Sequence, residues 1–333
     1  MAADRLTDKI YGCLLGGLIG DAMGAPTEGM HYRQIIEEFG PEGVTDFEGV
    51  GTDDTAIRGQ LIDAIFKSDG HPTVDHFAQS FKDFRDQNRH LWFIPVRNAF
   101  HKFDQGVELP AYAGWGNMQS SSTAMAISPM GIINACDPRQ AELETMDVAS
   151  FIHNGASGYC RDAACAMAAS VAAAFDANAT VESVVYAATR YLLPVSAAEI
   201  KQTIAAALDL AAESGSYELF RESFYERFQR TVLADSMETI PATLAILTLA
   251  EGDPARAITW GANFGRDADT IATMVGGVAG ALHGASGLPS EWVAKVEANT
   301  DVTYRDDSRR LARIVRRRIE ESKERLAALE SLA

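Results

Sequence analysis

Cysteine is scarce in this chain, and no two cysteines form a paired motif. The 333 residues contain four, at Cys13, Cys136, Cys160 and Cys165, with no CxxC pair among them. A disulfide-stapled scaffold and zinc sites built from CxxC pairs are therefore excluded. We expect buried free thiols in a reducing compartment, which predicts a cytoplasmic location.

Positive charge and long apolar runs are also scarce. Lys and Arg number 29 against 46 Asp and Glu, which gives a formal net charge of −17. Nucleic acids and anionic membranes are bound through positive charge, so neither is expected as a partner. The apolar run at 10–19 is too short to cross a bilayer. The charges before this run cancel, whereas a signal peptide begins with net positive charge.

The motifs of several large enzyme classes are missing. None of the seven histidines begins an HExxH sequence, which disfavours zinc hydrolysis. The chain has no GxSxG elbow, no Walker loop and no GxGxxG after a predicted strand. Serine-hydrolase chemistry and the common nucleotide-binding folds are therefore disfavoured.

Alternating strand patterns are scarce too, and helical spacing dominates. Apolar residues recur every three or four positions at 57–65 and 240–250, and alanine-rich tracts fill 163–175, 181–191 and 197–212. No flexible linker or fixed-period repeat divides the chain. We predict an all-α protein with one domain at 1–333. It ends in a charged, solvated helix at about 303–330.

Two short acidic clusters are the most informative feature. Gly51–Thr55 and Arg266–Thr270 each put two carboxylates beside threonine at the apparent start of a helix. Such residues are good helix N-caps, so capping alone explains one cluster. Two clusters of the same composition hold more acidic groups than caps can use. If they converge, their mutual repulsion requires cations, and oxygen ligands favour magnesium, manganese or calcium.

Glycine-rich helices accompany these clusters. Four glycines lie among leucines and isoleucines at 12–20, and four more follow the second cluster at 276–284. A glycine within a helix costs up to about 1 kcal/mol relative to alanine, so repeated glycine needs a compensating gain. Close packing between helices supplies this gain. Such packing occurs either around a rigid metal site or in a crowded core that holds no metal site.

Three further polar segments are ambiguous by themselves. Asp21 and Glu28 lie on or just beyond the end of the first glycine-rich helix. Asp21 either accepts a hydrogen bond that orients a ligand or forms a turn, and the composition favours the turn. Glu28 is either a ligand or an exposed loop residue. A second segment runs from Asn117 through Ser121, Ser122 and Thr123 to a predicted helical stretch at 124–133. This segment either begins a helix whose free backbone amides bind a ligand, or is a flexible loop that precedes a capped helix. His153 either touches a ligand or caps a helix.

These motifs, in this order, resemble the ADP-ribosylglycohydrolase family, whose members include dinitrogenase-reductase-activating glycohydrolase. The segments that carry the resemblance are GDAMGAPTE (20–28), GTDDT (51–55), SSTAMAISPMG (121–131), His153 and GRDADTIATMVGGVAGALHG (265–284). The resemblance implies an all-α orthogonal helical bundle with two magnesium or manganese ions in a central cleft.

Specific residue roles follow from the resemblance. It implies metal ligands at Glu28, Thr52, Asp53, Asp54, Asp267, Asp269 and Thr270. We expect Asp53, Asp54 or Asp267 to accept the proton of an attacking water. Substrate contacts are expected at Asn117, Ser121, Ser122, Thr123 and His153.

The implied activity is hydrolysis of a ribosyl glycosidic bond. The loop at 121–131 departs from the NGSLMRIAPLG pattern of members that act on ADP-ribose, since Ser122 replaces its glycine and Ala126 its arginine. The substrate is therefore an ADP-ribosylated protein side chain or a related ADP-ribosyl compound, or alternatively a small nucleoside-like N-glycoside. A non-catalytic, crystallin-like member and a metal-dependent phosphohydrolase are further alternatives.

Overall fold

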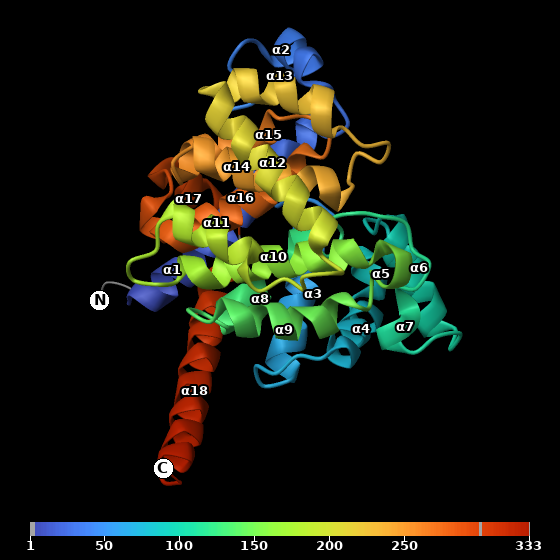
Figure 1. Cartoon of the computed structure of the whole chain (residues 1–333), viewed down its shortest axis with the longest axis vertical. Helices are drawn as coiled ribbons and strands as arrows, with labels where there is room; N and C mark the ends of the chain where they lie inside the picture. The colour runs from blue at the N-terminus through green and yellow to red at the C-terminus, as the bar shows by residue number, and fades with distance from the viewer. Residues whose placement is uncertain (1–3, 300–301, 333) are drawn as a thin grey trace.

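The computed structural model describes residues 4–299 and 302–332, and in this part the chain forms helices and loops with no extended strand (Figure 1). The helices are α1 (Arg5–Gly24), α2 (Tyr32–Phe39), α3 (Asp53–Lys67), α4 (Val74–Asp83), α5 (Arg85–Asn88), α6 (Ile94–Asp104), α7 (Pro110–Ala113), α8 (Ser128–Ile133), α9 (Pro138–Ala149), α10 (Gly158–Ala174), α11 (Val181–Arg190), α12 (Ala198–Ser214), α13 (Tyr217–Phe228), α14 (Ser236–Leu249), α15 (Pro254–Ala262), α16 (Ala268–His283), α17 (Ser290–Glu297) and α18 (Tyr304–Glu330). The prediction of an all-α fold is confirmed.

Helices α1 and α16 are the glycine-rich pair, and they pack backbone against backbone. A Cβ atom on Gly16 would lie 2.1 Å from the carbonyl oxygen of Gly276, and one on Gly280 would lie 2.0 Å from that of Gly12. Only glycine permits this approach. The predicted close packing is therefore present, and it fixes the C-terminal end of α1 against the start of α16.

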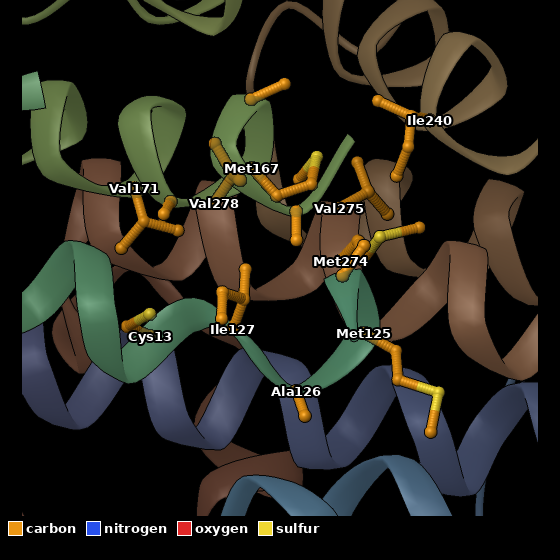
Figure 2. Packing of buried hydrophobic residues seen from close by; sticks show 14 of the residues in the cluster. Cys13, Met125, Ala126, Ile127, Met167, Val171, Ile240, Met274, Val275 and Val278 are labelled. Atoms are coloured by element: carbon orange, nitrogen blue, oxygen red, sulfur yellow. The ribbon is translucent and has the colours of Figure 1, made fainter. Parts of the chain in front are cut away.

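The hydrophobic core surrounds this pair. Figure 2 shows Ala126 and Ile127 lying over α1, with Met167 of α10 and Val275 of α16 on the other side. All four residues are buried. The rigid centre of the protein therefore carries the segments that hold the two acidic clusters.

Most predicted helical segments are confirmed, with one correction to a helix and one to the predicted burial of a cysteine. The stretch predicted as one helical run at 124–133 is a short 3₁₀ turn followed by α8, because Pro129 in the first turn of α8 begins a new helix. Cys136 is exposed, whereas the other three cysteines are buried free thiols as predicted.

The charged C-terminal helix predicted at about 303–330 is α18, which spans Tyr304–Glu330. Its first half packs against the body, and its second half projects away from it (Figure 1). Within the described residues, the search for a helix both long and apolar enough to span a membrane found no candidate.

Candidate metal centre

The two acidic clusters meet at the starts of α3 and α16. Thr52 occupies the N-cap position of α3 and Asp267 that of α16, yet neither side chain caps its own helix. Instead, the clusters contact each other. The hydroxyl of Thr270 donates to Asp54 Oδ2 at 3.3 Å, and the hydroxyl of Thr52 lies 3.3 Å from Asp269 Oδ2. Capping therefore does not account for these residues.

Three carboxylates of the clusters are buried with unsatisfied oxygens. Asp54, Asp267 and Asp269 are at most 4% exposed. One oxygen of each, Oδ1 of Asp54, Oδ2 of Asp267 and Oδ1 of Asp269, has no hydrogen-bond partner in the described part of the chain. A buried, unpaired polar atom costs about 1–3 kcal/mol, and more when charged. The donor set and its unpaired oxygens therefore fit hard divalent cations.

Burial and mutual repulsion raise the pKa values of these carboxyls. Burial, and then the charge of Asp21, raises the pKa of Asp53 to about 7. The same two causes raise the pKa of Asp54 well above its ordinary value. Burial is also the largest cause of the raised pKa values of Asp267 and Asp269. Such a cluster binds protons or cations to relieve the repulsion.

The carboxylates form two groups that share one member. Ligand oxygens of Asp21, Asp54 and Asp269 lie within 4.8 Å of one another, and so do those of Glu28, Asp267 and Asp269. Asp269 therefore belongs to both sets of oxygens. Asp53 belongs to neither group.

Asp21 is a residue that sequence reasoning undervalued. The expected turn is wrong, because Asp21 lies inside α1 and is fully buried. Its carboxylate accepts hydrogen bonds from the backbone amides and hydroxyls of Thr52 and Thr55, at 2.6–2.9 Å. It thus anchors the start of α3 from another helix. Gly51 makes room for it, since a Cβ there would lie 2.3 Å from Asp21 Oδ2.

A second anchor holds the start of α16. Arg266 has a φ of 62°, a left-handed conformation that is rare for arginine. Its guanidinium makes a bidentate pair with buried Glu238, at 2.7 and 2.8 Å. The amide of Gly29 donates to the Arg266 carbonyl, and the Arg266 amide donates to Met30. These bonds tie the loop that carries Glu28 to the segment that carries Asp267.

A pocket of about 320 Å³ opens onto the cluster. Acidic side chains form one wall, and the start of α6 with the segment before it forms another. The residues that line the pocket are Glu28, Asp53, Asp54, Leu91, Trp92, Phe93, Ile94, Arg97, Ser121, Ser122, Met125, Leu233, Ala234, Asp267, Asp269 and Thr270. Within the described residues, Arg97 is the one basic side chain on this wall.

The expected substrate residues divide into two sets. Ser121 and Ser122 line the pocket, whereas Asn117, Thr123 and His153 do not. The Asn117 amide donates to two backbone carbonyls in the interior. His153 is fully buried between the hydroxyls of Ser120 and Thr123, and burial lowers its pKa to about 3. These three side chains lie outside the pocket lining, and their hydrogen bonds join the loop to neighbouring segments. Their role as substrate contacts stays a prediction.

Comparison with known proteins identifies the relationship. The sequence model of the ADP-ribosylglycohydrolase family matches residues 2–325. The chain belongs to the ADP-ribosylglycohydrolase family. It is similar to the bovine (Bos taurus) ADP-ribosylhydrolase ARH3, with 26% identity over 90% of this chain and 92% of the relative. It is also similar to an ADP-ribosylarginine hydrolase of Pseudomonas putida (strain GB-1), with 27% identity over 89% and 76%.

A solved structure has the same fold as this ADP-ribosylglycohydrolase family member. The structure of an ADP-ribosylglycohydrolase-related protein complex aligns with a TM-score of 0.66 and 20% identity, over 95% of this chain and 99% of that chain. The resemblance drawn from the motifs and the prediction of an all-α bundle are thus confirmed. The prediction that the chain is a hydrolase of glycosidic bonds is confirmed by the family and the two relatives. The roles of individual site residues stay predictions.

Magnesium is expected to raise the melting temperature of this family member more at about pH 8 than at about pH 6. Asp53 has a pKa of about 7 in the folded chain and about 4 when unfolded. The protonated Asp53 side chain therefore contributes fully to the free energy of unfolding below about pH 4. This contribution is lost as the pH rises through about 7. Cations held by the neighbouring carboxylates offset the charge of ionised Asp53 and restore this stability.

The measurement is thermal unfolding across this pH range, with either EDTA or magnesium. Asp53→Asn removes the titrating group, so its metal-free stability should fall less steeply between about pH 4 and 7 than that of the wild type. A magnesium effect of the same size at every pH would contradict the prediction.

Proposed function

We propose that this protein is a dimetal-dependent glycohydrolase that removes ADP-ribose from modified protein side chains. One observation carries the proposal: buried carboxylates from two distant segments converge, with unpaired oxygens, on a pocket wide enough for a sugar. The relatives support the substrate class, since they include an ADP-ribosylhydrolase and an ADP-ribosylarginine hydrolase.

Two magnesium or manganese ions are the proposed cofactors. Asp54 and Asp269 would hold one cation. Asp267, Asp269 and Glu28 would hold the other. The hydroxyls of Thr52 and Thr270 would complete the set of ligands. When bound, the cations supply positive charge that orients sugar hydroxyls and lowers the pKa of water. Asp21 is better suited to orienting α3 than to binding a cation, because both of its oxygens already accept hydrogen bonds.

Asp53 is the best-placed proton acceptor among the expected candidates Asp53, Asp54 and Asp267. It lines the pocket, lies outside both ligand groups and is less buried than the other two. In the proposed reaction, the oxygen of a water bonds to the anomeric carbon and one of its protons passes to Asp53. The glycosidic bond breaks with its electron pair on the leaving atom, which then takes the proton. The surrounding carboxylates favour positive charge developing on the sugar.

Arg97 is proposed to bind an anionic group of the substrate, such as a phosphate. It is exposed and lines the same pocket as the acidic side chains. The buried indole nitrogen of Trp92, on the same side, has no hydrogen-bond acceptor among the described residues. Charge-assisted contacts of this kind hold phosphate well. This arrangement favours ADP-ribose over an uncharged nucleoside.

Replacing Arg97 by alanine is expected to raise KM for an ADP-ribosyl substrate by about tenfold and to leave kcat within about twofold. The contact is remote from the bond that breaks, so it contributes to binding in both the ground and transition states. Steady-state kinetics measure the two constants. Arg89→Ala is the matched control, because Arg89 is also exposed but does not line the pocket. A fall in kcat with unchanged KM would contradict this role.

Hydrolysis of a small nucleoside-like N-glycoside is the second candidate. The hydroxyl of Ser121 donates to the Ala234 carbonyl at 3.0 Å, and that of Ser120 donates to Ser122 at 2.9 Å, so both of these protons are already used. The loop therefore offers fewer free donors to a diphosphate than its serine content suggests.

A substrate panel with magnesium or manganese tests the proposal. It contains arginine-linked and serine-linked ADP-ribosyl peptides, ADP-ribose derivatives and nucleosides. Release of free ADP-ribose from a peptide supports the first candidate, and turnover of nucleosides alone supports the second. Release of inorganic phosphate would support a phosphohydrolase instead. No turnover on any substrate with either metal would exclude both proposed reactions.

A further inference from the structure

One buried positive charge lies near the acidic clusters but outside the pocket that they line. Arg58 follows Asp54 by one turn of α3, is 1% exposed and does not line the pocket. An arginine side chain stays protonated in a folded protein, so its guanidinium carries a full charge here. A buried charge costs several kcal/mol unless neighbouring groups compensate for it. The groups that contact Arg58 therefore identify what its charge stabilises.

The hydrogen bonds of Arg58 end on two hydroxyls. Its Nε and Nη2 atoms donate to the hydroxyl of Tyr304, at 3.2 and 3.1 Å. Nη2 also donates to Oγ1 of Thr55, at 3.0 Å. Tyr304 begins α18, and the guanidinium carbon lies 5.6 Å from the centroid of its ring. Within the described residues no carboxylate accepts a hydrogen bond from Arg58, so its charge acts through these hydroxyls.

The hydroxyl of Thr55 connects Arg58 to Asp21. A guanidinium can only donate hydrogen bonds, so Thr55 Oγ1 accepts from Arg58 and directs its own single proton elsewhere. That proton goes to Oδ2 of Asp21, at 2.6 Å. Hydrogen bonds that involve a charged partner are the strong ones. The Asp21 carboxylate is therefore joined to a positive charge through one hydroxyl.

Asp21 in turn determines where the proton of Thr52 points. The Thr52 hydroxyl donates to Asp21 Oδ1 at 2.8 Å, whereas Asp269 Oδ2 is farther away, at 3.3 Å. With its proton on the Asp21 side, the Thr52 oxygen offers lone pairs toward Asp269. Two acceptor oxygens that face each other repel, and a divalent cation bound by both removes that repulsion. The position of the Asp21 carboxylate thus prepares Thr52 as a ligand.

Gly17 makes room for the guanidinium. A Cβ atom at this position would lie 2.3 Å from Nη1 of Arg58 and 3.1 Å from its Cζ. Gly17 and Asp21 are one turn apart on α1. The same helix therefore accommodates the arginine and carries the carboxylate that the arginine holds.

We propose that Arg58 is a positioning residue for the metal centre, acting on Asp21 through Thr55. The guanidinium orients the Thr55 hydroxyl, this hydroxyl holds the Asp21 carboxylate, and the carboxylate turns the Thr52 oxygen toward the cation site. The role rests on the proposed dimetal function. It adds to that function a charged group that lies outside the pocket lining and acts only through other residues.

Calorimetric titration of magnesium, and of manganese in a second series, into the full metal-free chain tests this role. Arg58→Met removes the charge and the donors but keeps an unbranched side chain, and it should weaken cation binding about 10-fold. Thr55→Val removes the hydroxyl between Arg58 and Asp21 and should have a similar effect. Both residues act in one chain of hydrogen bonds, so the double variant should bind within about threefold of either single variant.

Arg58→Lys separates the positioning role from a general loss of packing. It keeps a positive charge and N–H donors, so cation binding should stay within about threefold of the wild type. Arg318→Met is the matched control, because Arg318 is also largely buried but pairs with Glu144, outside the acidic clusters. This control should lower the melting temperature in EDTA and leave cation binding within about twofold.

Wild-type cation binding by folded Arg58→Met would overturn the role of Arg58 and leave the dimetal function standing. Independent, additive losses in the double variant would do the same, and so would an Arg58→Lys variant that binds as weakly as Arg58→Met. If Arg58→Met does not fold, unchanged cation binding by Thr55→Val overturns the role. A wild-type chain that binds neither magnesium nor manganese would overturn both this inference and the proposed function.

Discussion

Replacing Asp54 by asparagine is expected to stabilise the metal-free protein and to abolish its glycohydrolase activity. The side chain is buried among carboxylates, and the charges of Asp21 and Asp269 contribute to its raised pKa. Asparagine has the same shape without the charge, so at about pH 8 the free energy of unfolding should rise by about 1 kcal/mol or more. Losing a cation ligand should lower kcat/KM by roughly 1,000-fold, about 4 kcal/mol.

Two measurements on each protein check this pair of effects. Chemical denaturation in EDTA gives the free energy of unfolding, and initial rates with saturating magnesium give kcat/KM. Asp63→Asn is the matched control, because Asp63 lies on the same helix and pairs with Lys67 away from the cluster. It should retain activity and gain no stability. An Asp54→Asn variant that is both less stable and active would contradict the metal role.

The prediction of the fold was confirmed where the residues of one segment are enough to determine its structure. The apolar face of Ile57, Leu61 and Ile65 is buried in α3 because helical periodicity alone determines which side is apolar. The glycines at 12–20 and 276–284 indicated close packing because no other role justifies their helical cost. Sequence could not show that these two segments pack against each other, since that pairing depends on all the helices between them.

The prediction of the site was less complete, for a related reason. Composition singled out the carboxylates at 53–54, 267 and 269, because each cluster holds more acidic groups beside threonine than a helix cap can use. It gave Asp21 to a turn, since nothing local reveals that α1 continues through this position and aims a carboxylate at α3. Arg97 and Trp92 carried no motif at all. They became candidates only when the fold set the start of α6 beside the acidic wall.

Replacing Gly276 by alanine is expected to destabilise the protein by about 3 kcal/mol. The new Cβ would lie 2.3 Å from the backbone oxygen of Gly16 and 3.0 Å from Ile258. The nearest of these atoms is backbone, so α1 and α16 must separate. Because α1 carries Asp21 and α16 carries Asp269, the separation should also weaken magnesium binding, by about 10-fold or more. Denaturation and calorimetric titration measure the two effects.

Gly277 is the matched control, one residue farther along the same buried helix. A Cβ there meets nothing closer than the Cys13 carbonyl oxygen at 3.7 Å, which is an ordinary contact. Alanine is the better helix former, so Gly277→Ala should leave stability unchanged or raise it by up to about 1 kcal/mol, with magnesium binding intact. Equal losses from both substitutions would mean that helix backbone strain, and not the contact between α1 and α16, determines the stability. A loss of magnesium binding would then not be attributable to separation of α1 and α16.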